Sequence, residues 1–210
     1  MFDLNYFNNK KVLVVCLYVD DLIYMGNDRS MFNEFKKSMM KEFDMTDLGL
    51  MHYFLGIEVV QSFDGIFISH KKYALKILDR FKMKNCNSVS TPTDLTLKLI
   101  KDDAGKKVNA TLYKQIVRSL IYLTSTWLDI MNVVSLISRY MECPTETHLL
   151  VAKRIFRYLK GTADYGILYK RDRNSSLIGF SDSDYAGDID DRKSVTPSNY
   201  NIMKSQTFLY

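Results

Sequence analysis

The sequence predicts a protein of the α+β class, with short strands near both ends and a block of helices between them. The first 70 residues contain short apolar runs separated by turn residues, which is typical of strands. Residues 111–160 instead contain longer segments with helical periodicity. The composition is 47% hydrophobic and 25% charged, which gives one large or two small globular domains enough apolar side chains for a core.

The first strand pair is expected in the segment VLVVCLYVDDLIYM, residues 12–25. The run from Val12 to Val19 is apolar on both faces, and Asp20 and Asp21 separate it from the apolar LIYM. This pattern predicts a buried β-hairpin with two acidic side chains at its turn.

A helix is expected next, over residues 31–43, where apolar residues recur every four positions. Asp28 or Ser30 can cap it. Two further strands, HYFLGIEVVQ and GIFIS, are expected at residues 52–61 and 65–69, and the Asp-Gly pair between them favours a tight turn.

The middle of the chain is expected to combine helices with one polar connection. Ser69 is predicted to cap a helix whose apolar residues share one face as far as Phe81. Residues 85–108 are polar, contain Pro92 and have no sustained period, so they are predicted to form a linker.

Three helices and two strands complete the expected order of elements. The helices are predicted at residues 113–126, 130–141 and 144–160. The strands are YGILYKR, residues 165–171, and SLIGFSDSD, residues 176–184.

Positive charge is concentrated in the middle of the chain, although the formal net charge is only +5. Residues 71–171 hold 19 Lys and Arg against 8 Asp and Glu, whereas residues 1–70 hold 6 against 10 and residues 172–210 hold 4 against 6. This distribution suits a polyanion partner held between acidic metal sites. An ordinary solvated set of lysines explains the same counts.

Cysteine usage and the start of the chain indicate an intracellular protein. Cys16, Cys86 and Cys143 are widely spaced among apolar or neutral residues and are expected to be buried, reduced thiols. No secretory signal and no apolar run long enough to cross a bilayer is apparent, so a cytoplasmic particle or the nucleus is expected, without a membrane partner. No pattern indicates an oligomeric state.

Asp20 and Asp21 are the strongest candidates for chemistry. Two carboxylates about 5 Å apart repel each other by roughly 3 kcal/mol at an effective dielectric near 20, so a cation is expected between them. Oxygen ligands on a hairpin suit Mg²⁺, which polymerases use in pairs for phosphoryl transfer. The alternative is a turn that contains Asp because Asp tolerates tight turns.

Several segments carry a resemblance to a known family. Tyr18-Val19-Asp20-Asp21 resembles the catalytic hairpin of reverse transcriptases. Five further blocks resemble, in order, the copia-type retrotransposon Pol polyprotein: FDMTDLGLMHYFLGIEV, GIFISHKKYALKIL, SLIYLTSTWLDI, HLLVAKRIFRYLKGTADYGILY and FSDSDYAGDIDDRKS. The resemblance extends over nearly the whole chain, up to Ser194.

The resemblance implies part of a reverse-transcriptase palm, a helical thumb and connection region, and the first strands of a ribonuclease H-like domain. The implied regions are the C-terminal half of the palm with the start of the thumb at 1–84, a linker at 85–110, the helical connection at 111–172 and the ribonuclease H start at 173–210.

The resemblance also implies site residues. Asp20 and Asp21 would be palm ligands of catalytic Mg²⁺, and Tyr18 would lie beside the primer end. Asp182 would be the first metal ligand of the ribonuclease H. The implied partners are an RNA/DNA template–primer duplex and a deoxynucleoside triphosphate.

Two sets of residues would contact that duplex. The first set resembles the family's hairpin that grips the primer backbone and comprises Tyr53, Phe54, Leu55 and Gly56. A basic helical surface comprises Lys153, Arg154, Arg157 and Lys160.

Departures from the family pattern leave alternatives to a working enzyme. The fingers and the palm strand with a third carboxylate would precede Met1, so polymerisation by this chain alone is not expected. Arg118, Trp127 and Leu128 stand where the family usually has Gly, Arg and Pro. A non-catalytic nucleic-acid-binding remnant and a pseudogene product therefore remain alternatives.

Overall fold

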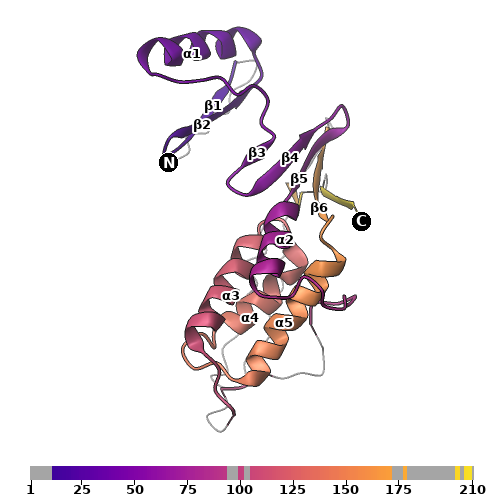
Figure 1. The fold of residues 1–210 in the computed structure, drawn as a ribbon. Helices are drawn as coiled ribbons and strands as arrows, with labels where there is room; N and C mark the ends of the chain where they lie inside the picture. Colours follow the sequence, from indigo (N-terminus) through magenta and orange to yellow (C-terminus); the bar gives the residue numbers. More distant parts are fainter. Residues whose placement is uncertain are drawn as a thin grey trace. The chain divides into compact units, whose positions relative to one another are not determined.

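The structure is a computed structural model that describes residues 11–93, 99–101 and 105–171, with the backbone of short strands at 177–178, 202–203 and 206–209. The chain divides into two compact units, Met1–Met51 and His52–Tyr210 (Figure 1). We call them unit 1 and unit 2.

The described residues of unit 1 form one hairpin and one helix. Strand β1 (Leu13–Tyr18) pairs antiparallel with β2 (Asp21–Gly26), and α1 (Arg29–Glu42) follows. Tyr24 of β2 contacts Phe32 and Phe35 of α1 with ring centroids 5.6 and 5.4 Å apart, so the helix covers one face of the hairpin. The predicted hairpin and helix are confirmed.

Asp28 caps α1, as the sequence allowed. Its side chain accepts a hydrogen bond from the Met31 N–H. Hydrogen bonds from the Ser30 hydroxyl and the Lys11 ammonium hold the pKa of the Asp28 carboxyl well below its usual range.

The prediction that this hairpin is buried is wrong. None of residues 11–51 is buried, and Leu17 at the end of β1 is 69% exposed. One helix can cover only one face of a two-stranded sheet, and such a hairpin is marginal by itself. No described element of unit 1 covers the other face.

Unit 2 is built on a five-stranded antiparallel sheet in the order β3-β4-β5-β6-β9. Its strands are β3 (Tyr53–Phe54), β4 (Ile57–Gln61), β5 (Gly65–Ser69), β6 (Gly166–Lys170) and β9 (Gln206–Leu209). A separate pair joins β7 (Leu177–Ile178) and β8 (Ile202–Met203). The sheet therefore brings residue 66 beside residue 169, across the helices that separate them in sequence.

The single strand predicted at 52–61 is two strands. Leu55 and Gly56 have φ of 47° and 84°, so both lie in the left-handed region and form a two-residue turn between β3 and β4. Positive φ at both central residues is the requirement of a type I′ hairpin turn. Leucine rarely adopts a left-handed conformation, so the sequence pattern could not indicate a turn at Leu55.

The helices are α2 (Lys71–Arg80), α3 (Ala110–Leu123), α4 (Met131–Ser138) and α5 (Glu146–Gly161), with a short 3₁₀ turn η1 (Leu128–Ile130). The predicted cap by Ser69 is wrong, because Ser69 is the last residue of β5 and His70 precedes α2 without a capping hydrogen bond.

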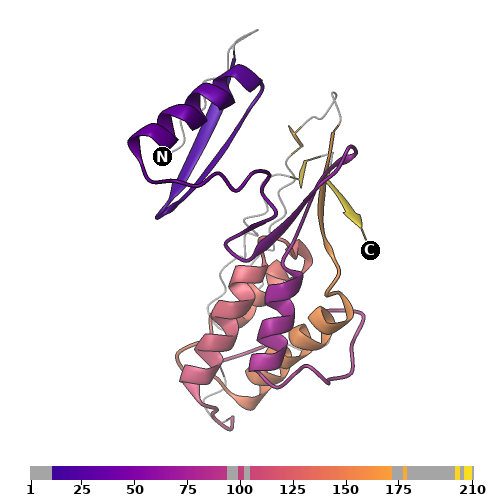
Figure 2. The same ribbon diagram turned by 45° about the horizontal axis from the view of Figure 1, so that its top comes forward.

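The four helices enclose the core of unit 2, and Figures 1 and 2 show α2 lying along α3 and α5. Trp127, Tyr113 and Phe156 are its largest buried side chains. Phe81, just after α2, stacks on Phe156 of α5 with ring centroids 5.3 Å apart. The Tyr113 hydroxyl donates to the Ile137 carbonyl at 2.9 Å, which satisfies its polar atom inside the core.

The described part of the predicted linker packs along the helices. The Tyr140 hydroxyl donates to the Leu99 carbonyl at 3.1 Å. His148 binds the next residue, Ile100. The Nδ1 atom of His148 lies 3.0 Å from the backbone nitrogen of Thr145, whose N–H can only donate, so Nδ1 accepts. The ring proton is therefore on Nε2, which donates to the Ile100 carbonyl 3.1 Å away. The proposed division at 85–110 stays a prediction, but this segment is held by specific hydrogen bonds.

Three smaller expectations concern single side chains and the membrane. Cys16, Cys86 and Cys143 are free, as predicted, but they are half-buried rather than buried. Arg118 points to solvent, so it carries no burial penalty. Within the part of the chain that the structure describes, no helix has the length and apolar character needed to cross a membrane.

The core contact can be tested on one helix. We expect Leu120→Ala to lower the free energy of unfolding by about 2–5 kcal/mol, because Leu120 of α3 is fully buried and its truncation leaves a cavity. Leu112→Ala, on the same helix at 45% exposure, should change it by less than about 0.5 kcal/mol. Urea unfolding followed by circular dichroism measures both, and equal losses would contradict the packing of α3.

Candidate functional site

The turn of the β1–β2 hairpin has a strained backbone. Tyr18 pairs with Asp21, so Val19 and Asp20 form the turn, and Val19 has φ of 51°. A β-branched residue in the left-handed region is a genuine outlier, and such strain clusters at functional sites. The sequence placed both acids at the turn, whereas the structure makes Asp21 the first residue of β2.

The acidic tip lies on the open side of the hairpin. Side chains alternate along a strand, so Asp21 and its partner Tyr18 lie on the face opposite Tyr24, the residue that packs on α1. Tyr18 is 50% exposed, and Asp20 and Asp21 are exposed. Tyr18 and Asp21 therefore share the open face, and Asp20 is exposed in the adjoining turn.

The two carboxylates fit a hard divalent cation. Ionised Asp offers only acceptor oxygens, and Mg²⁺ is commonly held by one or two carboxylates while water and substrate phosphates complete its shell. The described residues contain no group of three or more His, Cys, Asp or Glu that could hold a metal ion. Asp182 lies outside the described residues, so its predicted role stays a prediction.

The β3–β4 turn is a second strained and exposed feature, within unit 2. Leu55 in the left-handed region costs about 1–2 kcal/mol relative to Gly. Tyr53 is 56% exposed and Leu55 is 40% exposed, so the predicted contact residues present a large apolar surface at the tip. Phe54 is half-buried behind them.

Helices α2 and α3 support this turn. A Cβ added to Gly56 would lie 3.0 Å from the Tyr122 hydroxyl, so α3 approaches the turn closely. Lys72 of α2 lies over the Tyr53 ring, 5.6 Å from its centroid, and its Nζ is 3.6 Å from a Glu58 carboxylate oxygen. Because Tyr53 and Glu58 are paired across β3 and β4, one lysine contacts both strands.

His70 lies buried beneath the same region. Its Nδ1 is 2.7 Å from the Thr126 hydroxyl oxygen, and its Nε2 has no hydrogen-bond partner among the described residues. Burial lowers the pKa of His70, and the negative charge of Glu58 opposes that shift. The neutral imidazole is therefore the form that the fold favours.

The predicted basic surface on α5 divides into two kinds of residue. Lys153 and Lys160 are exposed. Arg154 donates to the Thr91 hydroxyl at 3.0 Å and Arg157 donates to the Asn87 carbonyl at 2.8 Å, so both hold the segment before residue 94 against α5.

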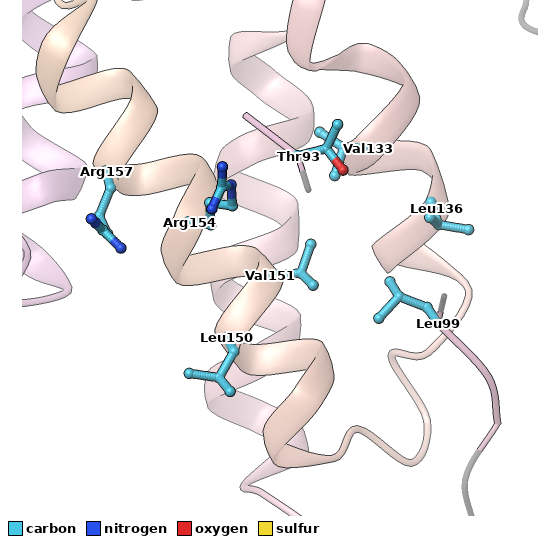
Figure 3. A pocket seen from close by; sticks show the side chains of 8 residues that line it. All are labelled: Thr93, Leu99, Val133, Leu136, Leu150, Val151, Arg154 and Arg157. Carbon is cyan, nitrogen blue, oxygen red and sulfur yellow. The ribbon is translucent and has the colours of Figure 1, made fainter. Parts of the chain in front are cut away.

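Figure 3 shows these two arginines at the wall of a cavity of about 220 Å³ between α4 and α5. Its other lining residues are mainly apolar: Thr93, Leu99, Val133, Leu136, Leu150 and Val151. The two arginines thus have structural partners that a count of charges cannot indicate, and their contact with nucleic acid stays a prediction.

Sequence reasoning missed Tyr122, His70 and Thr126 as parts of a site. His70 and Thr126 are 56 positions apart, and Tyr122 and Gly56 are also far apart in sequence. Nothing local in the sequence signals these contacts, because they arise only when α3 packs behind the β3–β4 turn.

A family model and several known proteins match this chain. The family model for reverse transcriptase (RNA-dependent DNA polymerase) matches residues 1–95. The chain is 38% identical over 182 residues to the retrovirus-related Pol polyprotein from transposon RE1 of Arabidopsis thaliana, covering 87% of this chain and 12% of the polyprotein. The Pol polyprotein from transposon TNT 1-94 of Nicotiana tabacum is 36% identical over 200 residues, covering 90% of this chain and 15% of that protein.

A shorter relative matches along most of its length. An uncharacterised mitochondrial protein of Arabidopsis thaliana is 35% identical over 184 residues, which is 88% of this chain and 76% of that protein. No solved structure matches the chain.

Acid should destabilise the fold through His70. The pKa of buried His70 is lowered, so its contribution to stability is present above about pH 6.5 and is lost as pH falls below that value towards the folded pKa. We expect the free energy of unfolding to fall between about pH 7.5 and 5, and His70→Gln to reduce that dependence. His52→Gln, at an exposed histidine, is the control. Chemical unfolding at several pH values measures the effect, and identical slopes in all three proteins would refute it.

Proposed function

Because the chain belongs to the reverse transcriptase family of copia-type retrotransposon Pol polyproteins, we propose that it supplies part of the machinery of RNA-directed DNA synthesis. It corresponds to a section of such a polyprotein that includes reverse transcriptase sequence and spans 12–15% of the length of these relatives. The observation that carries the proposal is the strained, exposed Val19 turn with Asp20 and Asp21 beside it.

Asp20 and Asp21 would hold divalent cations at the tip of the β1–β2 hairpin. When bound, such ions activate the attacking hydroxyl and stabilise the leaving pyrophosphate in phosphoryl transfer. The carboxylates would bind and orient the ions on the open face of the hairpin, and the exposed Tyr18 ring would lie beside the primer end. Two carboxylates leave much of the coordination to water and substrate, so the chain alone would bind the ions weakly.

The β3–β4 turn would contact the sugar–phosphate backbone of the primer. Tyr53 and Leu55 are exposed at this turn, Phe54 is half-buried behind them, and the positive φ of Leu55 and Gly56 sets its shape. Contacts to the backbone position a duplex without reading its sequence, which is the task that a primer-holding element performs. Template, primer and deoxynucleoside triphosphate are accordingly the proposed partners.

The finer division of the chain is also proposed. Residues 1–84 would belong to the palm and the start of the thumb, 111–172 to the connection, and 173–210 to the beginning of a ribonuclease H. Asp182 would then be a metal ligand of that ribonuclease H in the longer polyprotein.

A second candidate function is nucleic-acid binding without catalysis. It is favoured by the exposed Lys153 and Lys160 on α5 and by the positive balance of residues 71–171. Primer extension with Mg²⁺, with this section placed in a full-length Pol polyprotein of the family, separates the candidates: synthesis that Asp20→Asn with Asp21→Asn abolishes supports the polymerase. A salt-dependent duplex shift that survives this double substitution, without any synthesis, supports the binding function.

Cation binding at the tip can be measured without activity. We expect Mn²⁺, used as a paramagnetic substitute for Mg²⁺, to broaden the backbone amide signals of residues 18–22 before those elsewhere. Asp20→Asn with Asp21→Asn should remove this selective broadening, because it removes both anionic ligands. Asp44→Asn with Asp64→Asn removes the same charge at exposed positions elsewhere and should leave it intact. Uniform broadening in the unsubstituted chain would count against a cation site.

Duplex binding should depend on the exposed lysines of α5. We expect Lys153→Ala with Lys160→Ala to weaken binding of a fluorescent RNA/DNA duplex and to reduce the slope of log K against log salt by roughly 2, since each phosphate contact contributes about 1. Lys37→Ala with Lys41→Ala on α1 is the charge-matched control. Fluorescence anisotropy at several salt concentrations measures both, and equal effects would indicate diffuse attraction rather than a contact on α5.

A further inference from the structure

The β3–β4 turn needs support from outside its own strands. Leu55 and Gly56 both adopt left-handed backbone conformations, and β3 contains only two residues, so the hairpin has few cross-strand pairs to hold that geometry. A strained conformation persists only where the surrounding structure over-determines it. The residues that pack behind the turn therefore decide whether its shape is fixed.

Tyr122, near the end of α3, lies directly behind the turn. Its hydroxyl oxygen and ring carbon Cε1 are 3.0 and 3.2 Å from the position of a Cβ on Gly56. Any side chain at residue 56 would meet the tyrosine, and conversely the tyrosine limits how far the turn can move backwards.

Tyr122 is itself held by two other rings. Tyr73 of α2 meets it edge to face, with centroids 4.8 Å apart and an interplanar angle of 62°. His70 meets it at 5.1 Å and 72°, and Thr126 fixes the imidazole through Nδ1. Aromatic pairs in this arrangement are favourable and directional, so the ring of Tyr122 has a defined orientation.

We propose that Tyr122 is a positioning residue that fixes the β3–β4 turn for contact with a nucleic-acid backbone, with Tyr73 and His70 holding it in place. The inference rests on the proposed function of that turn. Tyr122 acts through Gly56 and Leu55 and is assigned no contact with the nucleic acid itself. A fixed turn presents the exposed Tyr53 and Leu55 in one arrangement, so binding does not require the turn to be ordered first.

Hydrogen exchange of the full chain tests the positioning role directly. In Tyr122→Ala we expect amides of residues 53–58 to exchange about tenfold faster, while protected amides of α5 keep their rates. Adding Leu55→Gly should restore protection in the turn, because Gly adopts the left-handed conformation without strain. The turn then no longer needs the support of Tyr122. Ile121→Ala is the matched control, because Ile121 is the adjacent residue of α3 with a similar exposed fraction, 46% against 40% for Tyr122, and it should change neither region.

Two results would overturn the proposal at this step. One is unchanged exchange of residues 53–58 in Tyr122→Ala. The other is a uniform acceleration across α5 and the turn that Leu55→Gly fails to reverse, because that would show a general packing role.

Duplex binding provides the functional readout. We expect Tyr122→Ala to weaken binding of a fluorescent RNA/DNA duplex by roughly threefold to tenfold with an unchanged salt slope, since no charge is lost. Leu55→Gly removes a proposed contact side chain, so the double variant is compared with Leu55→Gly alone, and adding Tyr122→Ala to Leu55→Gly should change the affinity little. A loss on adding Tyr122→Ala that is as large in the Leu55→Gly chain as in the unsubstituted chain would refute the positioning role in binding.

Failure of the underlying function is separately visible. If Tyr53→Ala in the otherwise unchanged chain leaves duplex affinity intact, the turn does not contact nucleic acid and the proposed function of the turn fails. The exchange measurement still decides whether Tyr122 fixes the turn, because it needs no ligand.

Discussion

Unit 2 depends on the buried contact between α2 and α5. Ala74, Ile77 and Leu78 of α2 are buried, and Phe81 stacks on Phe156. This contact joins segments about 75 residues apart, and β5 and β6, which flank the same helices, pair in consequence. Burial of several large side chains, each worth about 1.5–3 kcal/mol, outweighs the entropy of closing so long a loop, which grows only slowly with length.

The same packing determines which parts of the sheet are exposed to a ligand. Because β5 and β6 are central, and α2 and α3 pack close to the strands, the short β3–β4 hairpin is left at an edge with its tip exposed. The described part of unit 1, residues 11–51, has no comparable core, since none of its residues is buried. A hairpin covered by one helix buries little apolar surface, so we expect unit 1 to be marginally stable by itself. Among the described residues, each unit has a hairpin turn that contains a non-glycine residue with positive φ, Val19 in unit 1 and Leu55 in unit 2, and Lys82 after α2 shares this conformation.

Much of the fold could be predicted from local patterns, and the site only in part. Apolar periodicity predicts α1, α5 and the β1–β2 hairpin. Asp20 and Asp21 are identified as candidate metal ligands because they interrupt an apolar run with two charges. The split of residues 52–61 was not predictable from alternation, because it depends on Leu55 accepting a left-handed conformation. The support by Tyr122 was not predictable for a different reason: it is a tertiary contact between residues that share no local pattern.

The departures from the family pattern fit the fold that the chain adopts. Arg118 lies on the exposed face of α3, where a long cationic side chain carries no penalty. Trp127 is 2% exposed and adds a large apolar surface to the core, although its Nε1 has no hydrogen-bond partner among the described residues, which costs about 1–3 kcal/mol. Full burial of so large a ring offsets a penalty of that size. The packing of unit 2 therefore accommodates both residues: the charge of Arg118 lies at the surface and the indole of Trp127 fills part of the core.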